Sequence, residues 1–136
     1  MFFVSGDAAA LHSARRSPFV AATTRERPTL LEARVPLDLL VGSLNDAGET
    51  YEGDVEARTI VLTDGSRGGL ANGRRYEAAK LPGPIEDTYG AGDSFSAALC
   101  FALARGDALT DALDLATRAG AAVITGRGPY SVQLTG

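Results

Sequence analysis

The chain has 136 residues, 45% of them hydrophobic and 22% charged, which is the balance of an ordinary globular protein rather than a disordered or fibrous one. Thirteen Lys and Arg against seventeen Asp and Glu give a formal net charge of −4, and a mildly acidic chain without a basic cluster excludes nucleic acid as the expected partner. The longest nearly apolar run, residues 95–104, is far shorter than a membrane span. The chain has one cysteine, Cys100, which allows no internal disulfide, so we expect a cytoplasmic protein with a buried free thiol.

Short β-like runs alternate with helical ones along the first half of the chain. The apolar runs are continuous rather than alternating, which is typical of strands covered on both faces of a parallel sheet. The predicted fold class is therefore α/β, a doubly wound, mostly parallel sheet with helices on both faces. We expect strands at residues 2–4, 19–22 and 37–41, a helix from the cap Asp7 to His12, and a second helix at 28–33 with Pro28 near its first turn.

The strongest strand signal of the chain is Arg58–Thr63, and it runs into the glycine-rich residues 64–69. A loop at the carboxyl end of a parallel strand is where open α/β sheets bind ligands, and glycines there allow a ligand to come close. Two short strands, 70–72 and 75–79, are expected to form a hairpin around Asn72-Gly73, a dipeptide that favours tight hairpin turns.

Two helices are expected in the last third of the chain. Apolar residues recur at helical spacing from Phe95, and Gly106 stands where that helix would end. The second helix is expected from Asp111 to about Val123, with Thr110 as its N-cap and an apolar stripe of alanine and leucine on one face.

The stretch Asp87-Thr88-Tyr89-Gly90-Ala91-Gly92-Asp93-Ser94 lies on the turn that opens the first of these helices. A helix start leaves about four backbone N–H groups without intrahelical partners and carries roughly half a positive charge. Small residues at 90–92 let an anion approach these donors. The carboxylate of Asp93 would repel a bound phosphate unless its task is to take a proton from the group that attacks that phosphate. Stabilisation of the helix dipole also explains an Asp in a first turn, so these residues alone leave a purely structural role open.

Other chemistries find no support in the sequence. Gly90-Ala91-Gly92 lacks the third glycine of a dinucleotide fingerprint, and no Gly-Lys-Ser/Thr sequence makes a P-loop. His12 is the single histidine, so neither a zinc site nor a Ser–His–Asp set is supported. Phosphoryl transfer is the chemistry that remains.

The segment DTYGAGDSF, followed by an alanine-rich helix, resembles the C-terminal signature of the ribokinase-like (PfkB) carbohydrate kinases. The resemblance implies that Asp93 is the catalytic base. It also implies that Gly90, Ala91 and Gly92 form an anion hole for the transferred phosphoryl group. The reaction implied is ATP-dependent phosphorylation, with Mg²⁺, of a sugar or a sugar-like hydroxyl.

A second segment, TDGSRGGL, is similar to the T-x-G-x-x-G segment of that family. This similarity implies that Thr63, Gly65 and Gly68 line the ATP phosphates. Thr117 stands where relatives often place an Asn or His beside the adenine ring, although core packing explains the helix around it without a ligand. Two phosphate-type loops in the family's order are better evidence than either loop alone.

An acidic segment follows the third expected strand. Ser43-Leu44-Asn45-Asp46 stands where the family usually carries Asn-x-x-Glu, a motif tied to magnesium and phosphate placement, so Asp46 would be the Mg²⁺ ligand. Glu49 is a rival for that role, and a solvated acidic loop is the structural alternative.

The segment from Ile124 to Ser131 resembles the family's V-T-x-x-G-A-x-P-S stretch, which in many members helps to bind a monovalent cation. Gly128 and Ser131, with the backbone oxygens of Asp87 and Tyr89, would then hold K⁺. The usual Pro-Ser pair is missing here, so a plain polar turn is the equal alternative.

The resemblance covers residues 1–136 as the C-terminal portion of a ribokinase-like kinase domain, without the N-terminal substrate and lid portion of relatives. We therefore expect an incomplete fold, a small-molecule sugar or nucleoside as substrate, and no membrane partner. A homodimer is a possible assembly of the full-length protein. Three alternatives stay open: a catalytically inactive nucleotide-binding remnant, a nucleoside kinase of the same superfamily, and a phosphate-binding interaction module.

Overall fold

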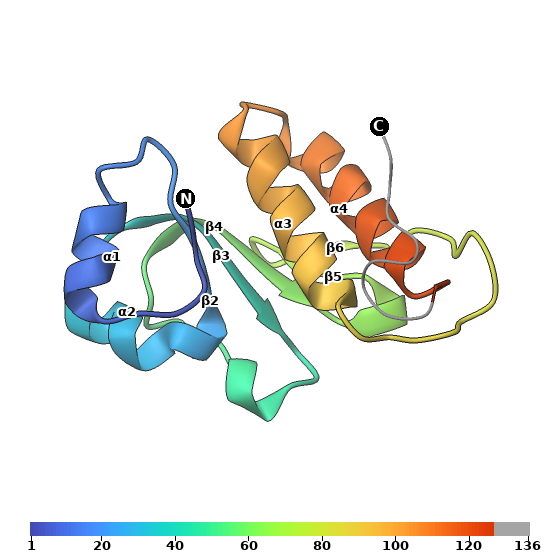
Figure 1. Ribbon diagram of the computed structural model, residues 1–136, viewed down its shortest axis with the longest axis horizontal. Coiled ribbons are helices and arrows are strands. Elements are labelled where there is room, and N and C mark those ends of the chain that lie inside the picture. The colour runs from blue at the N-terminus through green and yellow to red at the C-terminus, as the bar shows by residue number, and fades with distance from the viewer. Residues whose placement is uncertain (127–136) are drawn as a thin grey trace. The chain divides into compact units, whose positions relative to one another are not determined.

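The computed structural model describes residues 1–126, which form two compact units (Figure 1). The first unit contains Met1–Gly65 and Gly69–Arg75, and the second contains Ser66–Gly68 and the described residues from Tyr76 onward. The first unit holds nearly all of the sheet and two short helices. The second is built on two longer helices.

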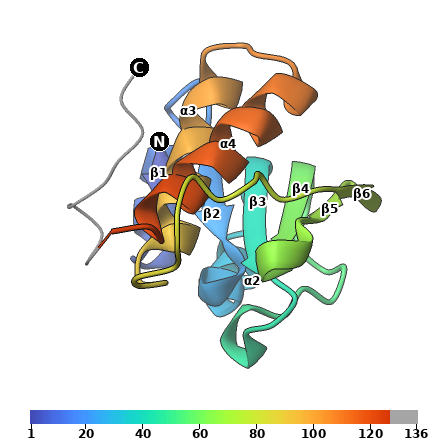
Figure 2. The same cartoon turned by 90° about the vertical axis from the view of Figure 1, so that its right-hand side faces the viewer.

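A six-stranded sheet follows the strands in chain order, β1-β2-β3-β4-β5-β6 (Figure 2). Neighbours from β1 to β4 are parallel, and β5 is antiparallel to β4. In the register of β3 and β4, Ser43 is opposite Thr63, so the carboxyl ends of these two strands lie side by side. The strands are β1 Phe2–Phe3, β2 Ala21–Thr23, β3 Leu37–Ser43, β4 Ala57–Thr63, β5 Gly69–Ala71 and β6 Arg74–Tyr76. The mostly parallel sheet expected from the sequence is confirmed.

Asn72 and Gly73 form the turn between β5 and β6, with φ values of 48° and 77°. Both lie in the left-handed region that the favoured two-residue hairpin turn requires, so the predicted hairpin is confirmed. Its second strand is shorter than expected, because after Tyr76 the chain leaves the sheet in the irregular connection 77–90 (Figure 2).

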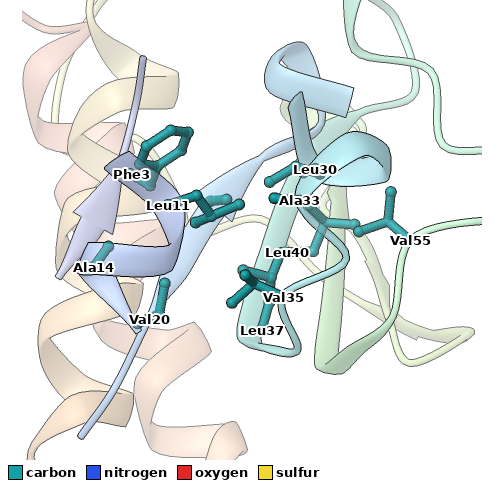
Figure 3. Close-up of a cluster of buried hydrophobic side chains, with 11 residues drawn as sticks. Phe3, Leu11, Ala14, Val20, Leu30, Ala33, Val35, Leu37, Leu40 and Val55 are labelled. Carbon is teal, nitrogen blue, oxygen red and sulfur yellow. The ribbon is translucent and has the colours of Figure 1, made fainter. Parts of the chain in front are cut away.

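Helices α1 (Ala8–Ala14) and α2 (Arg27–Ala33) share a hydrophobic core with the strands of the first unit (Figure 3). Leu11 of α1 and Leu40 of β3 are both fully buried in it. Burial of one such side chain contributes about 1.5–3 kcal/mol, so this core is a main source of the unit's stability. The buried cluster comprises Phe3, Leu11, Ala14, Val20, Ala22, Leu30, Ala33, Val35, Leu37, Leu40 and Val55.

Local sequence signals explain where α1 and α2 begin and end. Asp7 caps α1, because its Oδ1 accepts a hydrogen bond from the Ala10 amide at 2.8 Å. Pro28 lies in the first turn of α2, where a missing N–H costs little. The cap that ends α2, Arg34, has a left-handed φ of 51°. Both predicted helices are confirmed, and α1 runs two residues beyond the expected end at His12.

An ion pair ties the end of α1 to β3. Asp38 Oδ2 accepts hydrogen bonds from Arg15 at 2.6 Å and from the Val20 amide at 2.9 Å. Burial by itself would raise the pKa of Asp38, but the hydrogen bonds from Val20 and Arg15 outweigh it and hold that pKa below its usual range. Ionised Asp38 therefore joins three segments of the first unit.

The second unit contains α3 (Ala91–Ala104) and α4 (Leu109–Val123), which lie side by side (Figure 1). Gly90 precedes α3 with a φ of 81°, and Gly106 follows its end with a φ of 97°. Glycine adopts such values without strain, which is why the helix starts and stops at these two positions. The predicted helix and its start at the glycine turn are confirmed, and Cys100 within it is the expected buried free thiol, with a pKa raised by burial.

The predicted N-cap of α4 is wrong. Ala108 precedes the helix with extended backbone and no side-chain cap, and Thr110 lies inside the first turn. Asp111 falls in the same turn, where its negative charge favours the helix start through the helix dipole. The start of α4 is thus stabilised by a charge rather than by a capping hydroxyl. Across residues 1–126, none of the helices combines the length and apolarity that crossing a bilayer needs.

Candidate functional site

The turn before α3 leaves backbone donors open at the helix start. The Ala91 amide donates to Thr88 O at 3.4 Å, and the Ser94 amide makes the first intrahelical bond, to Gly90 O at 2.9 Å. Within residues 1–126, no backbone hydrogen bond is recorded for the amides of Gly92 and Asp93. Among the described residues these two N–H groups thus have no backbone acceptor, and they lie at the end of the helix that carries positive partial charge, which suits an anion.

Asp93 lies in the first turn of α3 with its side chain exposed to solvent. In the described part of the chain its carboxylate has no recorded hydrogen bond or ion pair. A Cβ added to Gly92 would meet no heavy atom within 4 Å, so space is open beside the free amides. Within residues 1–126, an exposed carboxylate and two amides without a backbone partner thus adjoin at one helix start, and the roles that the resemblance implies for them stay predictions.

The segment 86–89, which precedes this helix start in the chain, is hydrogen-bonded to the end of α4. The Glu86 amide donates to Ile124 O at 2.9 Å, and the Asp87 amide approaches the same oxygen at 3.4 Å. The side chain of Asp87 accepts from the Tyr89 amide at 2.9 Å, which closes a tight turn. Two of the residues expected to hold K⁺, Asp87 and Tyr89, thus lie next to the end of α4. The other two, Gly128 and Ser131, lie outside the described residues.

The glycine-rich loop after β4 takes the backbone geometry that its sequence suggests. Gly65 and Gly68 have φ values of 58° and 83°. A Cβ on Gly68 would stand 2.0 Å from Tyr76 O, so only glycine fits there. Thr63 ends β4, and its hydroxyl donates to Gly42 O at 3.3 Å. Glycine at 68 is therefore required by the close approach of the Tyr76–Glu77 backbone, and both glycines have left-handed φ values that they adopt without strain.

Sequence reasoning missed Asp64, which is buried at the carboxyl end of β4. Its carboxylate accepts from Asn45 Nδ2 at 3.2 Å and from Arg75 at 3.4 Å. Asn45 follows β3, so Asp64 links the ends of two neighbouring strands. A lone Asp between a strand and a glycine loop was the available signal, but its partners are 19 and 11 residues away and no local pattern identifies them.

The two candidate magnesium ligands share one arginine. Arg25 donates to Asp46 Oδ2 at 2.9 Å and to Glu49 Oε1 at 2.8 Å. Asp46 Oδ1 accepts from the Gly48 amide at 2.8 Å, and Ser43 Oγ accepts from the Asn45 amide at 3.2 Å. The carboxylates of Asp46 and Glu49 are therefore both paired with Arg25, whose side chain is exposed to solvent.

Carboxylate donors suit Mg²⁺, yet the described residues form no dedicated cage for it. No group of three His, Cys, Asp or Glu side chains in residues 1–126 is arranged to hold a metal ion. Mg²⁺ in phosphoryl-transfer sites keeps several waters and is held by one or two carboxylates together with the substrate phosphates. Asp46 fits such a role as a single contact, bound directly or through water.

Thr117 lies on α4, half-buried, and its hydroxyl donates to Asp114 O one turn earlier, at 3.0 Å. This bond occupies the hydroxyl's proton but leaves its lone pairs accessible. The position beside an adenine ring, which the resemblance implies for Thr117, stays a prediction.

A comparison with protein families matches residues 28–135 to the profile described as pfkB family carbohydrate kinase. A comparison with curated proteins found no match. Similar solved structures include Phosphofructokinase-2 from Escherichia coli in complex with potassium, with a TM-score of 0.70 and 18% identity over 93% of this chain and 48% of that one. Ribokinase from Cryptococcus neoformans var. grubii serotype A in complex with ADP has a TM-score of 0.69 and 24% identity, over 92% and 52%.

Adenosine kinase from Sinorhizobium meliloti is similar as well, with a TM-score of 0.67 and 22% identity over 90% of this chain and 43% of that one. Likeness at this identity shows a shared fold, and the predicted ribokinase-like α/β fold is confirmed. The chain spans about half the length of these solved structures, at 43–52%.

Proposed function

Because the chain belongs to the pfkB family of carbohydrate kinases, we propose that the protein transfers a phosphoryl group from ATP to a hydroxyl of a sugar or sugar-like acceptor. The observation that carries the proposal is the start of α3, where the exposed Asp93 carboxylate adjoins the free amides of Gly92 and Asp93. A phosphoryl group needs the amides, and an attacking hydroxyl needs the carboxylate.

Asp93 is the proposed general base. It accepts the proton of the acceptor hydroxyl as that oxygen attacks the γ-phosphorus and the bond from this phosphorus to the β–γ bridging oxygen breaks, which releases ADP. Such general-base assistance is typically worth about 10²- to 10⁴-fold in rate. Its exposure and the absence of a recorded partner in residues 1–126 leave the carboxylate able to take that proton. An Asp already neutralised by a nearby arginine, such as Asp46, would be a poorer base.

The backbone of residues 90–93 is the proposed anion hole, with Gly90, Ala91 and Gly92 as its small residues. The open amides would stabilise the charge that develops on the transferred group, and loss of one such donor costs roughly 3–4 kcal/mol in comparable sites. The left-handed Gly90 places the chain so that α3 starts directly after it. Glycine at 92 leaves room for the phosphoryl oxygens.

ATP is the proposed donor, bound as its magnesium complex. Thr63, Gly65 and Gly68 would line its phosphates, and Thr117 would lie beside the adenine. The left-handed glycines of the loop support this assignment, as does the structural likeness to a ribokinase solved with ADP. Asp46 would contact the Mg²⁺ that ATP brings, and the metal would neutralise phosphate charge.

A monovalent cation such as K⁺ is proposed at the segment 87–89. The turn at Asp87 and Tyr89 supports this proposal, because the amides of Glu86 and Asp87 hold this segment against Ile124 at the end of α4. The cation would fix the loop that precedes the anion hole.

The acceptor class is a sugar or a nucleoside, and the solved relatives include kinases of both kinds. One experiment tests the proposal: ATP turnover by the full-length protein with a panel of sugars, phosphosugars and nucleosides, beside calorimetry with MgATP. Turnover with at least one acceptor is the expected result. ATP binding without turnover would favour a nucleotide-binding remnant, and failure to bind any nucleotide would favour an interaction module.

A further inference from the structure

An aromatic pair connects the glycine loop after β4 with the start of α3, inside the second unit. The rings of Tyr76 and Phe95 are stacked, with centroids 6.1 Å apart and planes inclined by 16°. Phe95 is buried and follows Asp93 by two residues, in the first turns of α3. Stacked rings at this separation attract each other beyond their burial, so the pair is a defined contact and not a loose one.

The backbone of Tyr76 is also in close contact with Gly68. A Cβ on Gly68 would lie only 2.0 Å from the carbonyl oxygen of Tyr76 and 2.8 Å from the backbone of Glu77, so no side chain fits at this position. Gly68 has a φ of 83°, which other residues adopt only with strain. The position of Tyr76 is therefore coupled to that of the loop predicted to line the ATP phosphates.

Helix α4 also packs against the start of α3 near Phe95. A Cβ on Gly120 would lie 3.2 Å from Ala91 O and 3.5 Å from Phe95 Cβ. The absence of a side chain at 120 lets the backbone of α4 approach the first turn of α3. That turn carries both Ala91, of the proposed anion hole, and Asp93.

We propose that Tyr76, Phe95 and Gly120 are positioning residues, which hold the Asp93 turn at a fixed distance from the Gly68 loop. The proposal rests on the function proposed above. Tyr76 transmits the position of Gly68 to Phe95, and glycine at 120 lets α4 pack directly against the first turn of α3. None of the three touches the reacting atoms; they act by keeping the base and the phosphate loop in register for in-line transfer.

The first test compares Tyr76→Leu with Tyr76→Phe in the full-length protein. Leucine keeps an apolar side chain but removes the flat ring. A misplacement of about 1 Å costs on the order of 10²-fold, so the smaller displacement expected here should lower kcat roughly tenfold. The KM for the acceptor should not change. Phenylalanine keeps the stack and should restore kcat to within about twofold of the parent. A folded Tyr76→Leu variant with the parent kcat, or equal losses in both variants, would overturn the proposal.

The second test uses Gly120→Ala, which separates positioning from stability. Alanine favours a helix more than glycine does, so the melting temperature should not fall by much. The added methyl group presses on Ala91 O, so kcat should fall roughly fivefold by the same misplacement argument. This variant decides the matter if Tyr76→Leu fails to fold, and parent kcat in Gly120→Ala would then overturn the proposal.

Amide hydrogen exchange separates failure of this inference from failure of the proposed function. If the parent transfers no phosphoryl group, peptides covering 64–70 and 88–96 still report the coupling. Tyr76→Leu should raise exchange in both peptides and Tyr76→Phe in neither. Raised exchange in one peptide alone would show that the stack does not connect them.

Discussion

The strand ends of the first unit and the start of α3 in the second differ in whether their charged groups are paired within the described residues. In the first unit, charged side chains near the strand ends are bound to one another: Arg25 holds Asp46 and Glu49, and Asp64 accepts from Asn45 and Arg75. In the second unit, the start of α3 has an exposed carboxylate and two amides without recorded partners in residues 1–126.

This difference separates structure from chemistry. A carboxylate that is already paired with an arginine stabilises the fold but has little capacity left to take a proton. A helix start with open donors gains nothing for stability and is suited to an anion. We propose that the first unit mainly supplies a framework with the contacts of Thr63 and Gly65 to ATP, and that the proton transfer belongs to α3 of the second unit. The following predictions test this contrast, in order of decreasing effect.

The largest effect is expected from Asp93→Asn. The amide cannot accept the acceptor's proton, so kcat should fall by about 10²- to 10⁴-fold while ATP affinity is kept. Asp111→Asn is the matched control, because Asp111 is likewise the third residue of a helix, α4, and exposed. Steady-state turnover and calorimetry measure both variants. Equal kcat values for the two would show that Asp93 is only a helix-dipole residue.

Gly92→Ala should lower activity without lowering stability. Within residues 1–126 the new methyl group would meet no atom within 4 Å outside its own helical turn, and alanine favours a helix, so the melting temperature should hold or rise. It would occupy space that the phosphoryl oxygens need, and kcat/KM should fall roughly tenfold by loss of the charge stabilisation at the open amides. Thr110→Ala, at the same helical position of α4, should change neither quantity. A Gly92→Ala variant with parent kcat/KM would place the phosphoryl group elsewhere.

Asp46→Asn and Glu49→Gln distinguish the two magnesium candidates. Both substitutions weaken the pairing with Arg25, so that loss is common to the two variants. If Asp46 contacts the metal, only its variant should need several-fold more Mg²⁺ for half-maximal rate, since Mg²⁺ sites depend on one or two carboxylates. A titration of rate against free Mg²⁺ measures this. A shift in the Glu49 variant instead would reassign the ligand.

The smallest effect on catalysis, and a clear one on stability, is expected from Asp38→Asn. The depressed pKa of Asp38 means that its ionised form stabilises the fold above its unfolded pKa of about 3.9, and that this contribution is lost as pH falls through the lower folded pKa. The free energy of unfolding at pH 7 should drop by about 2 kcal/mol, the scale of a charged hydrogen bond.

Urea unfolding at pH 7 and at pH 3 checks this prediction. The difference in the free energy of unfolding between Asp38→Asn and the parent should be smaller at pH 3 than at pH 7. The kcat at pH 7 should stay unchanged. Asp114→Asn removes an exposed pair with Arg118 and should cost less than about 1 kcal/mol at either pH. A gap for Asp38→Asn that does not depend on pH would mean that packing, not charge, holds this residue.

Local patterns predicted most of the fold. Continuous apolar runs gave the parallel strands, Asn72-Gly73 gave the hairpin turn, and Gly90 and Gly106 marked the ends of α3. The local prediction that failed is the cap of α4, because the hydroxyl of Thr110 suggests an N-cap two residues after the observed cap at Ala108. Helix starts fixed by a charge such as Asp111 give a weaker sequence signal than a capping side chain.

The candidate site was predicted only where it is contiguous in sequence. Asp93 and its glycines are neighbours along the chain, so one motif contains them. The pairs Asn45–Asp64, Arg25–Asp46 and Arg15–Asp38 join residues 19 to 23 positions apart, and such pairs form only once the sheet has brought their strands together. The stack of Tyr76 on Phe95 is hidden for the same reason.

The most direct test of the central claim follows the backbone amides by nuclear magnetic resonance while MgADP and aluminium fluoride, a mimic of the transferred phosphoryl group, are added to the full-length protein. The account predicts that the Gly92 and Asp93 amide protons shift downfield as they donate to the mimic, whereas Leu109 and Thr110, at the start of α4, do not. Unchanged resonances at 92 and 93, or equal shifts at both helix starts, would contradict it.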